Sequence, residues 1–239
     1  MIPGELPGKF VSTRDALHQI AYFAMGPARY QAVGRMGLTA APGGFGTPEF
    51  EGRVARVQGD RLVHEQNGNS ASQNITTVRN AALFFGVDYV VHWYHQIKDP
   101  PEPMDPDAPL EVDEPSVLAL GDWFRFGYEV LEDLRRHAEP GDEASQVQLW
   151  PEHFDPATEI GSEAEGRRAS FGASPGDRDH PEPYVYVSAW SEVDRTNPYW
   201  NDRAFNGSSL GYGELVSGPD PSARALEFLL EGYRILLAD

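Results

Sequence analysis

The stretch that decides the fold is residues 147–190, VQLWPEHFDPATEIGSEAEGRRASFGASPGDRDHPEPYVYVSAW. Three of its segments alternate apolar and polar residues, the pattern of half-buried β-strands, and a Pro-Gly-Asp turn at 175–177 precedes the last of them. The stretch also holds two of the five tryptophans and two of the seven histidines, so it is the first place to look for a site. It predicts strands near residues 146–150, 154–160, 167–173 and 183–190.

Two helices flank these strands. Pro115 suits the first turn of a helix whose apolar face continues to His137. Asp220, followed by proline, opens a last helix with a continuous leucine-rich stripe. Both helices are expected to pack on a sheet or on another helix.

The first half of the chain predicts a similar mixture of elements. We expect a helix that starts at Ser12 or Thr13 and stops at Gly26, ahead of a proline. Gln58-Gly59-Asp60 predicts a hairpin turn, and the glycines of 42–46 indicate a turn or loop rather than a phosphate cradle. The other expectations are strands at 30–40, 49–66 and 87–94, a polar loop at 67–74, a short helix at 75–85 and a loop-rich segment at 191–218.

Together these elements predict an α+β fold, with one or two antiparallel sheets and three to four helices packed chiefly on one face. A proline- and acid-rich connection at 98–115 separates an N-terminal α+β half at 1–97 from a C-terminal α+β half at 116–239, and we expect one compact unit. Both halves run helix, strands, helix. An internal duplication and a common α+β arrangement both stay open as explanations.

The chain is strongly acidic. Its 37 Asp and Glu residues against 19 Lys and Arg give a formal net charge of −18, which disfavours nucleic acid and anionic membrane surfaces as partners. Cysteine is absent, which excludes disulfides, thiolate zinc ligands and a cysteine nucleophile. No secretory signal pattern opens the sequence and no apolar run approaches the ~18 residues of a membrane span. We therefore expect a soluble cytoplasmic protein.

Four short motifs in the C-terminal half carry a resemblance to a known family. They are Phe154-Asp155, Phe171-Gly172, Pro-Gly-Asp at 175–177 and Pro-Glu-Pro at 181–183. In these motifs the chain resembles an uncharacterised, mainly actinobacterial family known only as a domain of unknown function. The resemblance implies the fold and no activity. The family pattern has a histidine two residues before Phe154, where this chain has Glu152 and carries His153 instead.

The last predicted strand of the opening stretch has one aromatic face. Tyr184, Tyr186 and Trp190 share that face with Ser188, while the valines face the other way. Core packing, a ligand pocket and a partner surface are the three explanations of such a face. The pocket would have the composition usual for small-molecule sites. Its lining would be Trp150, Tyr184, Tyr186 and Trp190, with Arg168 or His153 as the polar anchor.

Histidines and carboxylates give the stretch a second interpretation. His153 and Asp155 are two residues apart, so on a strand both would point to one face, and His180 follows the Pro-Gly-Asp turn. Two nitrogens and a carboxylate suit a divalent metal or acid–base chemistry, and the alternative is local hydrogen bonding. His92 and His95 are three apart, so on a strand they would face oppositely and are not expected to chelate.

Three classes of function therefore stay open, and the sequence identifies neither a cofactor nor a catalytic residue. The first is a soluble protein that binds a small molecule at the aromatic sheet face without catalysis. The second is a metal-dependent or acid–base enzyme that uses His153, Asp155 and His180. The third is a homodimeric interaction protein that pairs through an exposed sheet edge or the last helix.

Overall fold

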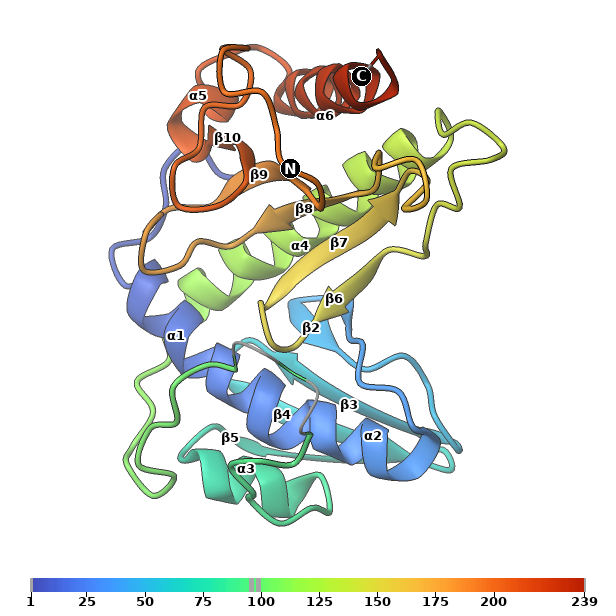
Figure 1. Ribbon diagram of the computed structural model, residues 1–239. Coiled ribbons are helices and arrows are strands. Elements are labelled where there is room, and N and C mark those ends of the chain that lie inside the picture. The colour runs from blue at the N-terminus through green and yellow to red at the C-terminus, as the bar shows by residue number, and fades with distance from the viewer. Residues whose placement is uncertain (1, 95–96, 98–99, 239) are drawn as a thin grey trace. The chain divides into compact units, whose positions relative to one another are not determined.

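The computed structural model of the protein describes residues 2–94, 97 and 100–238 (Figure 1). Over these residues the chain forms helices and two antiparallel five-stranded sheets, which confirms the predicted α+β class and gives one sheet to each half. The chain divides into two compact units, Met1–Arg125 with Leu149–Phe154 and Phe126–Gln148 with Asp155–Asp239. This division passes through helix α4 (Glu114–Arg135), so the described part of the proline- and acid-rich connection belongs to the first unit.

The first unit begins with one continuous helical rod. Helix α1 (Phe10–Ile20) leads into a π-helical turn, η1 (Ala21–Met25), and then into α2 (Gly26–Val33), as Figure 1 shows. The backbone N–H of Gly26 bonds to the carbonyl of Ala21, five residues back. The proline that follows lies in the first turn of α2, where its missing N–H disturbs the helix least, so the rod continues through it. The predicted stop at Gly26 and most of the strand predicted over 30–40 are therefore wrong.

The first sheet is a meander in the order β1-β2-β3-β4-β5. Gln58 pairs with Arg61 across the turn between β3 and β4, which confirms the predicted hairpin. The segment predicted as a polar loop is the edge strand β5, whose side chains are almost all exposed. A strand with no buried face shows no apolar alternation, so the pattern could not reveal it. The strands are β1 (Thr39–Ala41), β2 (Gly44–Gly46), β3 (Arg53–Gln58), β4 (Arg61–Gln66) and β5 (Asn69–Asn74).

Aromatic packing replaces the strand predicted at 87–94, which is irregular. The Tyr89 ring lies 5.2 Å from that of Phe23, and Trp93 lies 5.4 Å from Tyr22, so these side chains pack on the rod. Of the two histidines discussed there, His95 falls outside the described residues. The short helix predicted nearby is α3 (Val78–Phe84).

The second sheet has the order β10-β9-β8-β7-β6, and the four strands predicted in the opening stretch are present. Helices cover the face that carries the valines of β9. A Cβ placed on Gly232 of α6 would lie 3.0 Å from Val187, and one placed on Gly127 of α4 would lie 2.8 Å from Ala173. The elements are β6 (Gln148–Trp150), β7 (Asp155–Ile160), β8 (Ala169–Ser174), β9 (Tyr184–Ala189), β10 (Gly207–Gly211), α5 (Tyr212–Val216) and α6 (Pro221–Ala238).

Side-chain caps fix both long helices where the sequence predicted them. The Asp113 carboxylate accepts from the backbone N–H of Ser116 at 3.1 Å, and Asp220 accepts from Ala223 at 3.0 Å. Within the described part of the chain, none of the helices combines the length and the apolar character that a bilayer span requires.

Candidate ligand-binding site

The face of the second sheet opposite its valines carries the tyrosines of β9. Directly paired residues of an antiparallel sheet share a face, so Tyr184 lies beside Ser174 and Tyr186 lies between Gly172 and Ser209. A Cβ placed on Gly172 would lie 2.4 Å from the Tyr186 ring. The ring therefore lies directly over this glycine, and the small residues of β8 make room for the tyrosines.

Three neighbouring aromatic side chains, His180, Tyr184 and Tyr186, each contact the carboxylate of a different aspartate. The ring centroids of His180 and Tyr184 are 4.6 Å apart, and those of Tyr184 and Tyr186 are 5.9 Å apart. We call these three rings the aromatic ladder. The pairs are Tyr186 donating to Asp155 Oδ2 at 2.5 Å, Tyr184 donating to Asp177 Oδ2 at 2.6 Å, and His180 Nε2 at 2.9 Å from Asp202 Oδ2.

The Pro-Gly-Asp turn places the middle carboxylate. Asp177 Oδ1 accepts the backbone N–H groups of Asp179 and His180 at 2.7 and 2.8 Å. Burial acts to raise the pKa of Asp177, but the bonds from Tyr184 and from these two N–H groups outweigh it and hold that pKa below its usual value. Burial and the bond to Asp177 raise the pKa of Tyr184. At neutral pH Tyr184 is therefore a donor and Asp177 an ionised acceptor.

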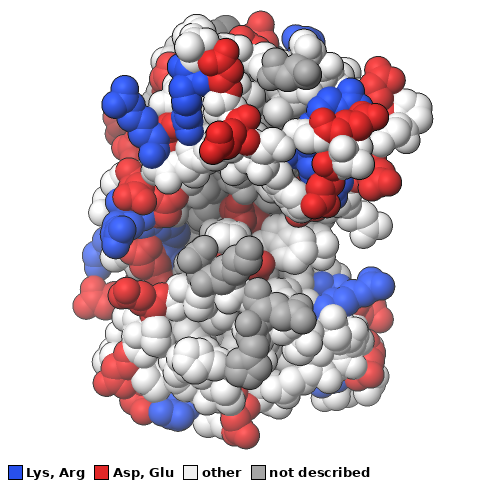
Figure 2. Space-filling view, in the orientation of Figure 1, with Lys and Arg blue, Asp and Glu red and all other residues white. Residues whose placement is uncertain are grey.

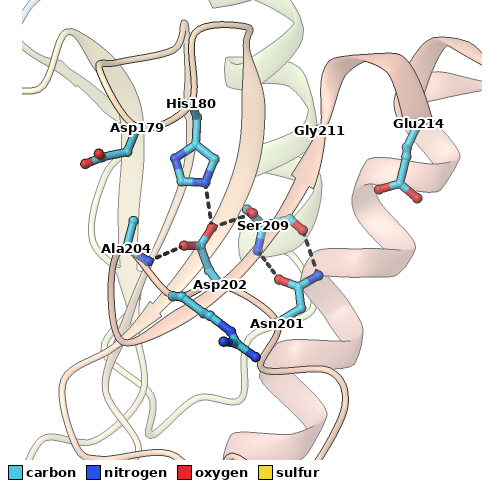
Figure 3. Close-up of a pocket in the computed structure, with 9 residues that line it drawn as sticks. Asp179, His180, Asn201, Asp202, Ala204, Ser209, Gly211 and Glu214 are labelled. Carbon is cyan, nitrogen blue, oxygen red and sulfur yellow. Dashed lines mark hydrogen bonds and ion pairs between the residues drawn. The ribbon is translucent and has the colours of Figure 1, made fainter.

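An open bowl of about 510 Å³ lies beside the ladder (Figure 3). Its lining comes from the loop after the Pro-Gly-Asp turn, the loop before β10, β10 itself and α5. The lining residues are Asp179, His180, Asn201, Asp202, Arg203, Ala204, Ser209, Gly211 and Glu214.

Asp202 organises one side of the bowl. Its side chain is only 3% exposed. The carboxylate accepts from the backbone N–H of Ala204 at 2.8 Å and from the Ser209 hydroxyl at 2.6 Å, besides its contact with His180. Asn201 bonds to the backbone of Ser209 through both its side-chain oxygen and its side-chain nitrogen, at 3.0 and 3.1 Å. Dashed lines in Figure 3 trace this network, which fixes the polar groups before any ligand arrives.

Two acidic side chains stand at the rim. Figure 3 shows Glu214, on α5, across the bowl from the His180–Asp202 pair, and shows the Asp179 carboxylate turned away from Asp202. Glu214 has a distant ion pair with Arg224, at 3.6 Å. Its carboxylate is thus available to a ligand that enters the bowl.

The residues predicted to line a pocket do not all belong to the same unit. Tyr184, Tyr186, Arg168 and Trp190 lie in the second unit, whereas Trp150 lies in the first. Tyr184 is buried, as core packing would require, and Trp190 is 49% exposed. None of the five lines the bowl, although the bowl and the two tyrosines share one sheet face.

The residues predicted as metal ligands each have a separate environment. His153 is exposed in a turn that ends at Phe154, whose φ of 56° breaks the strand, so β7 starts only at Asp155. Asp155 accepts from Tyr186, and His180 pairs with Asp202. Across residues 2–94, 97 and 100–238, no group of three or more His, Asp or Glu side chains is placed to hold a metal ion.

The sequence did not single out Asn201, Asp202, Ser209 or Glu214. These residues lie in the segment predicted as loop-rich, where Asn, Asp and Ser are ordinary turn residues. Their one signal is the pair Asn201-Asp202 shortly before Asn206-Gly207, and such a pair is common in loops. Only the pairing of β10 with β9 brings them to the ladder.

Comparisons with protein-family models, with curated proteins and with solved structures find no match for this chain. The resemblance to an uncharacterised actinobacterial family therefore stays a prediction. Function has to be argued from the site itself.

Proposed function

We propose that the protein binds a small, polar organic amine in the bowl beside the aromatic ladder and does not transform it. The observation that carries the proposal is the network around Asp202, which holds His180, Ser209 and the Ala204 N–H in fixed positions. Polar groups that are already fixed lose little conformational entropy when a ligand binds. A cytoplasmic location, as the composition predicted, belongs to the same proposal.

The charges around the bowl favour an amine over an anion. The lining contains the carboxylates of Asp179, Asp202 and Glu214 against the single guanidinium of Arg203. The whole chain carries a formal net charge of −18, and on the face in Figure 2 basic side chains lie beside acidic ones. The excess of acidic groups, in the lining and in the whole chain, attracts small cations and repels phosphate-bearing partners. An ammonium group would meet Glu214, and a hydroxyl or amide donor of the ligand would meet the Ser209 hydroxyl, which donates to Asp202 and can still accept.

The environment of His180 favours binding over acid–base catalysis. Its Nε2 lies 2.9 Å from Asp202 and its Nδ1 lies 3.7 Å from Asp177, so both ring nitrogens face carboxylates of the protein. A general base needs a ring nitrogen within reach of the proton it removes. The acid–base enzyme is therefore the weaker alternative, and the homodimer stays a prediction without an observation in its favour.

The test is isothermal titration of the full chain with a panel of polyamines, amino sugars and amino acids, with dicarboxylates and neutral sugars as comparisons. We expect at least one amine to bind and the dicarboxylates not to bind. Glu214→Gln should weaken the amine by about tenfold, because a charge-assisted hydrogen bond is replaced by a neutral one. Glu163→Gln, which removes an exposed carboxylate in the turn between β7 and β8, should leave the affinity unchanged.

Two results would contradict the proposal. One is a panel in which no amine binds. The other is an amine that binds the wild type and the Glu214→Gln variant equally well, because the ammonium would then lie elsewhere. Circular dichroism of each variant verifies the fold, which the exposed position of Glu214 is expected to preserve.

A further inference from the structure

We infer that the far end of the same sheet face is a second, separate binding site, and that Trp190 stacks there on the ring of a neutral saccharide. This inference is independent of the bowl, because it uses none of the bowl's residues. It begins from an exposed aromatic side chain. Trp190 follows the last residue of β9 and is 49% exposed, whereas the other aromatic residues of that strand are buried or half-buried.

The indole of Trp190 is held in one orientation although it is exposed. Its Nε1–H donates to the Ser170 hydroxyl at 3.1 Å, and the Arg168 guanidinium lies over the ring, 5.2 Å from the centroid. The backbone is fixed as well, since the Trp190 N–H donates to the Arg168 carbonyl and the Asn206 side chain donates to the carbonyls of Ala189 and Ser191. An indole that is already oriented loses little conformational entropy when a ligand stacks on it, so this restraint suits a stacking platform.

Arg168 is itself fixed by groups other than the indole. Its side chain is 13% exposed, donates to the Gly161 carbonyl at 3.0 Å and pairs with Glu159 at 2.8 Å. The guanidinium lies over one face of the indole, and Trp190 is nevertheless 49% exposed. A cation already occupies that face, so the exposed part of the indole is left for an uncharged ring.

Hydrogen-bonding groups surround the platform on the same sheet face. Ser170 pairs with Ser188 on one side and with Glu159 on the other, so all three side chains share the face with Trp190. The Ser188 hydroxyl has no hydrogen-bond partner among the residues the structure describes. Glu159 is 37% exposed and offers carboxylate oxygens to adjacent hydroxyl groups.

This combination selects the ligand class. The C–H face of a pyranose is weakly positive and packs against an indole, and its hydroxyls are both donors and acceptors. Ser188 offers either role, and Glu159 offers acceptors. A flat aromatic ligand would use the indole but leave these polar groups without partners. A phosphorylated ligand would be repelled by Glu159 and by the net charge of the chain.

The experiment titrates the full chain with glucose, galactose, maltose and cellobiose, and follows binding by intrinsic tryptophan fluorescence and by saturation-transfer NMR. We expect at least one sugar to bind in the millimolar range. Trp190→Ala should weaken it by about tenfold or more, as for a central aromatic contact, and Trp190→Phe should weaken it less. Ser188→Ala, at a half-buried strand position, tests the hydroxyl without removing the platform and should weaken the sugar less than Trp190→Ala does.

Controls separate this site from the bowl and from a general loss of exposed apolar surface. Glu214→Gln should leave sugar binding unchanged, so failure of either proposal is visible without the other. Leu83→Ala removes a side chain that is 59% exposed on α3 and should also have no effect. The inference is overturned if none of the four sugars binds, if Trp190→Ala and Trp190→Phe both bind as the wild type does, or if indole-like planar compounds bind at this site in preference to sugars.

Discussion

The imidazole of His18 stacks on the ring of Phe154, with the ring planes 6° apart and the centroids 5.2 Å apart. Its Nε2 lies 3.0 Å from the carbonyl oxygen of Pro151 and 3.1 Å from that of Glu152. Both partners can only accept, so Nε2 carries the hydrogen. Burial lowers the pKa of His18 to about 4, against the smaller opposing effect of the two carbonyl bonds. His18 is therefore a neutral donor that ties the turn before β7 to α1.

This contact predicts acid-sensitive stability. An unfolded histidine has a pKa near 6.5, so between pH 6.5 and 4 the unfolded chain binds a proton that the folded chain does not. The stabilisation is fully present above pH 6.5 and is lost as the pH falls through this window, by about 3 kcal/mol. Urea unfolding at pH 7.5 and at pH 4 measures the loss.

His18→Gln is the matched comparison, because glutamine can donate to the same carbonyls and does not titrate. The wild type should lose more stability than this variant between the two pH values, since carboxylates and the other histidines contribute equally to both proteins. Equal losses would mean that His18 becomes protonated inside the fold.

The position of the Tyr186 ring depends on the absence of a side chain at Gly172. A methyl group there would lie 2.4 Å from the Tyr186 ring and would force the tyrosine away from Asp155. We expect Gly172→Ala to cost about 1–3 kcal/mol of unfolding free energy. In a double-mutant cycle with Tyr186→Ala the alanine at 172 should cost far less, because the clashing ring is gone. Gly211→Ala, where no atom lies within 4 Å, is the control.

The sequence predicted the strands of residues 147–190 because each of them has a buried face. It missed β10, Gly207–Gly211, because glycine and serine have little intrinsic preference for strands. That segment is a strand because β9 offers it a partner edge. Where tertiary pairing decides the conformation, a local pattern carries no signal.

The residues of the candidate site also fall into those with a local sequence signal and those without one. The Pro-Gly-Asp turn and His180 stand out in the sequence, because a rare turn beside a histidine is a local feature. Asp202 reaches His180 only after the chain has crossed β9 and returned through a loop, so no spacing rule joins the two residues. The sequence therefore singled out His180, as a candidate metal or acid–base residue, and none of the residues of the loop before β10 that line the bowl with it.

A close approach of two glycines in the first unit predicts a larger cost of substitution. A Cβ on Gly121 of α4 would lie 2.8 Å from the backbone nitrogen of Gly44 in β2, and backbone cannot rotate aside as a side chain can. Gly121→Ala should therefore lower the unfolding free energy by about 3 kcal/mol, although alanine favours helices. Gly213→Ala on α5, with open space around it, should be neutral or slightly stabilising. Thermal unfolding of the two variants measures the difference. Similar melting temperatures for Gly121→Ala and Gly213→Ala would contradict the close packing of α4 on β2.

Tyr233 on α6 is expected to ionise only at high pH. Its hydroxyl donates to the buried carboxylate of Asp142 and accepts the backbone N–H of Glu139 at 2.8 Å. Burial, with the bond to Asp142, raises the pKa of Tyr233 to about 12. The measurement is a pH titration of tyrosinate absorbance in the wild type and in Tyr233→Phe. The difference between the two curves reports Tyr233 alone, and its midpoint should lie near pH 12. A midpoint near pH 10 would mean that the hydroxyl is in water. At pH 7 the same variant should lose about 1–3 kcal/mol, because Asp142 is left buried with one donor fewer. A midpoint near pH 12 without a loss of stability in Tyr233→Phe would mean that the hydrogen bond is present in the wild type. In the variant, water would then donate to Asp142 instead of the missing hydroxyl.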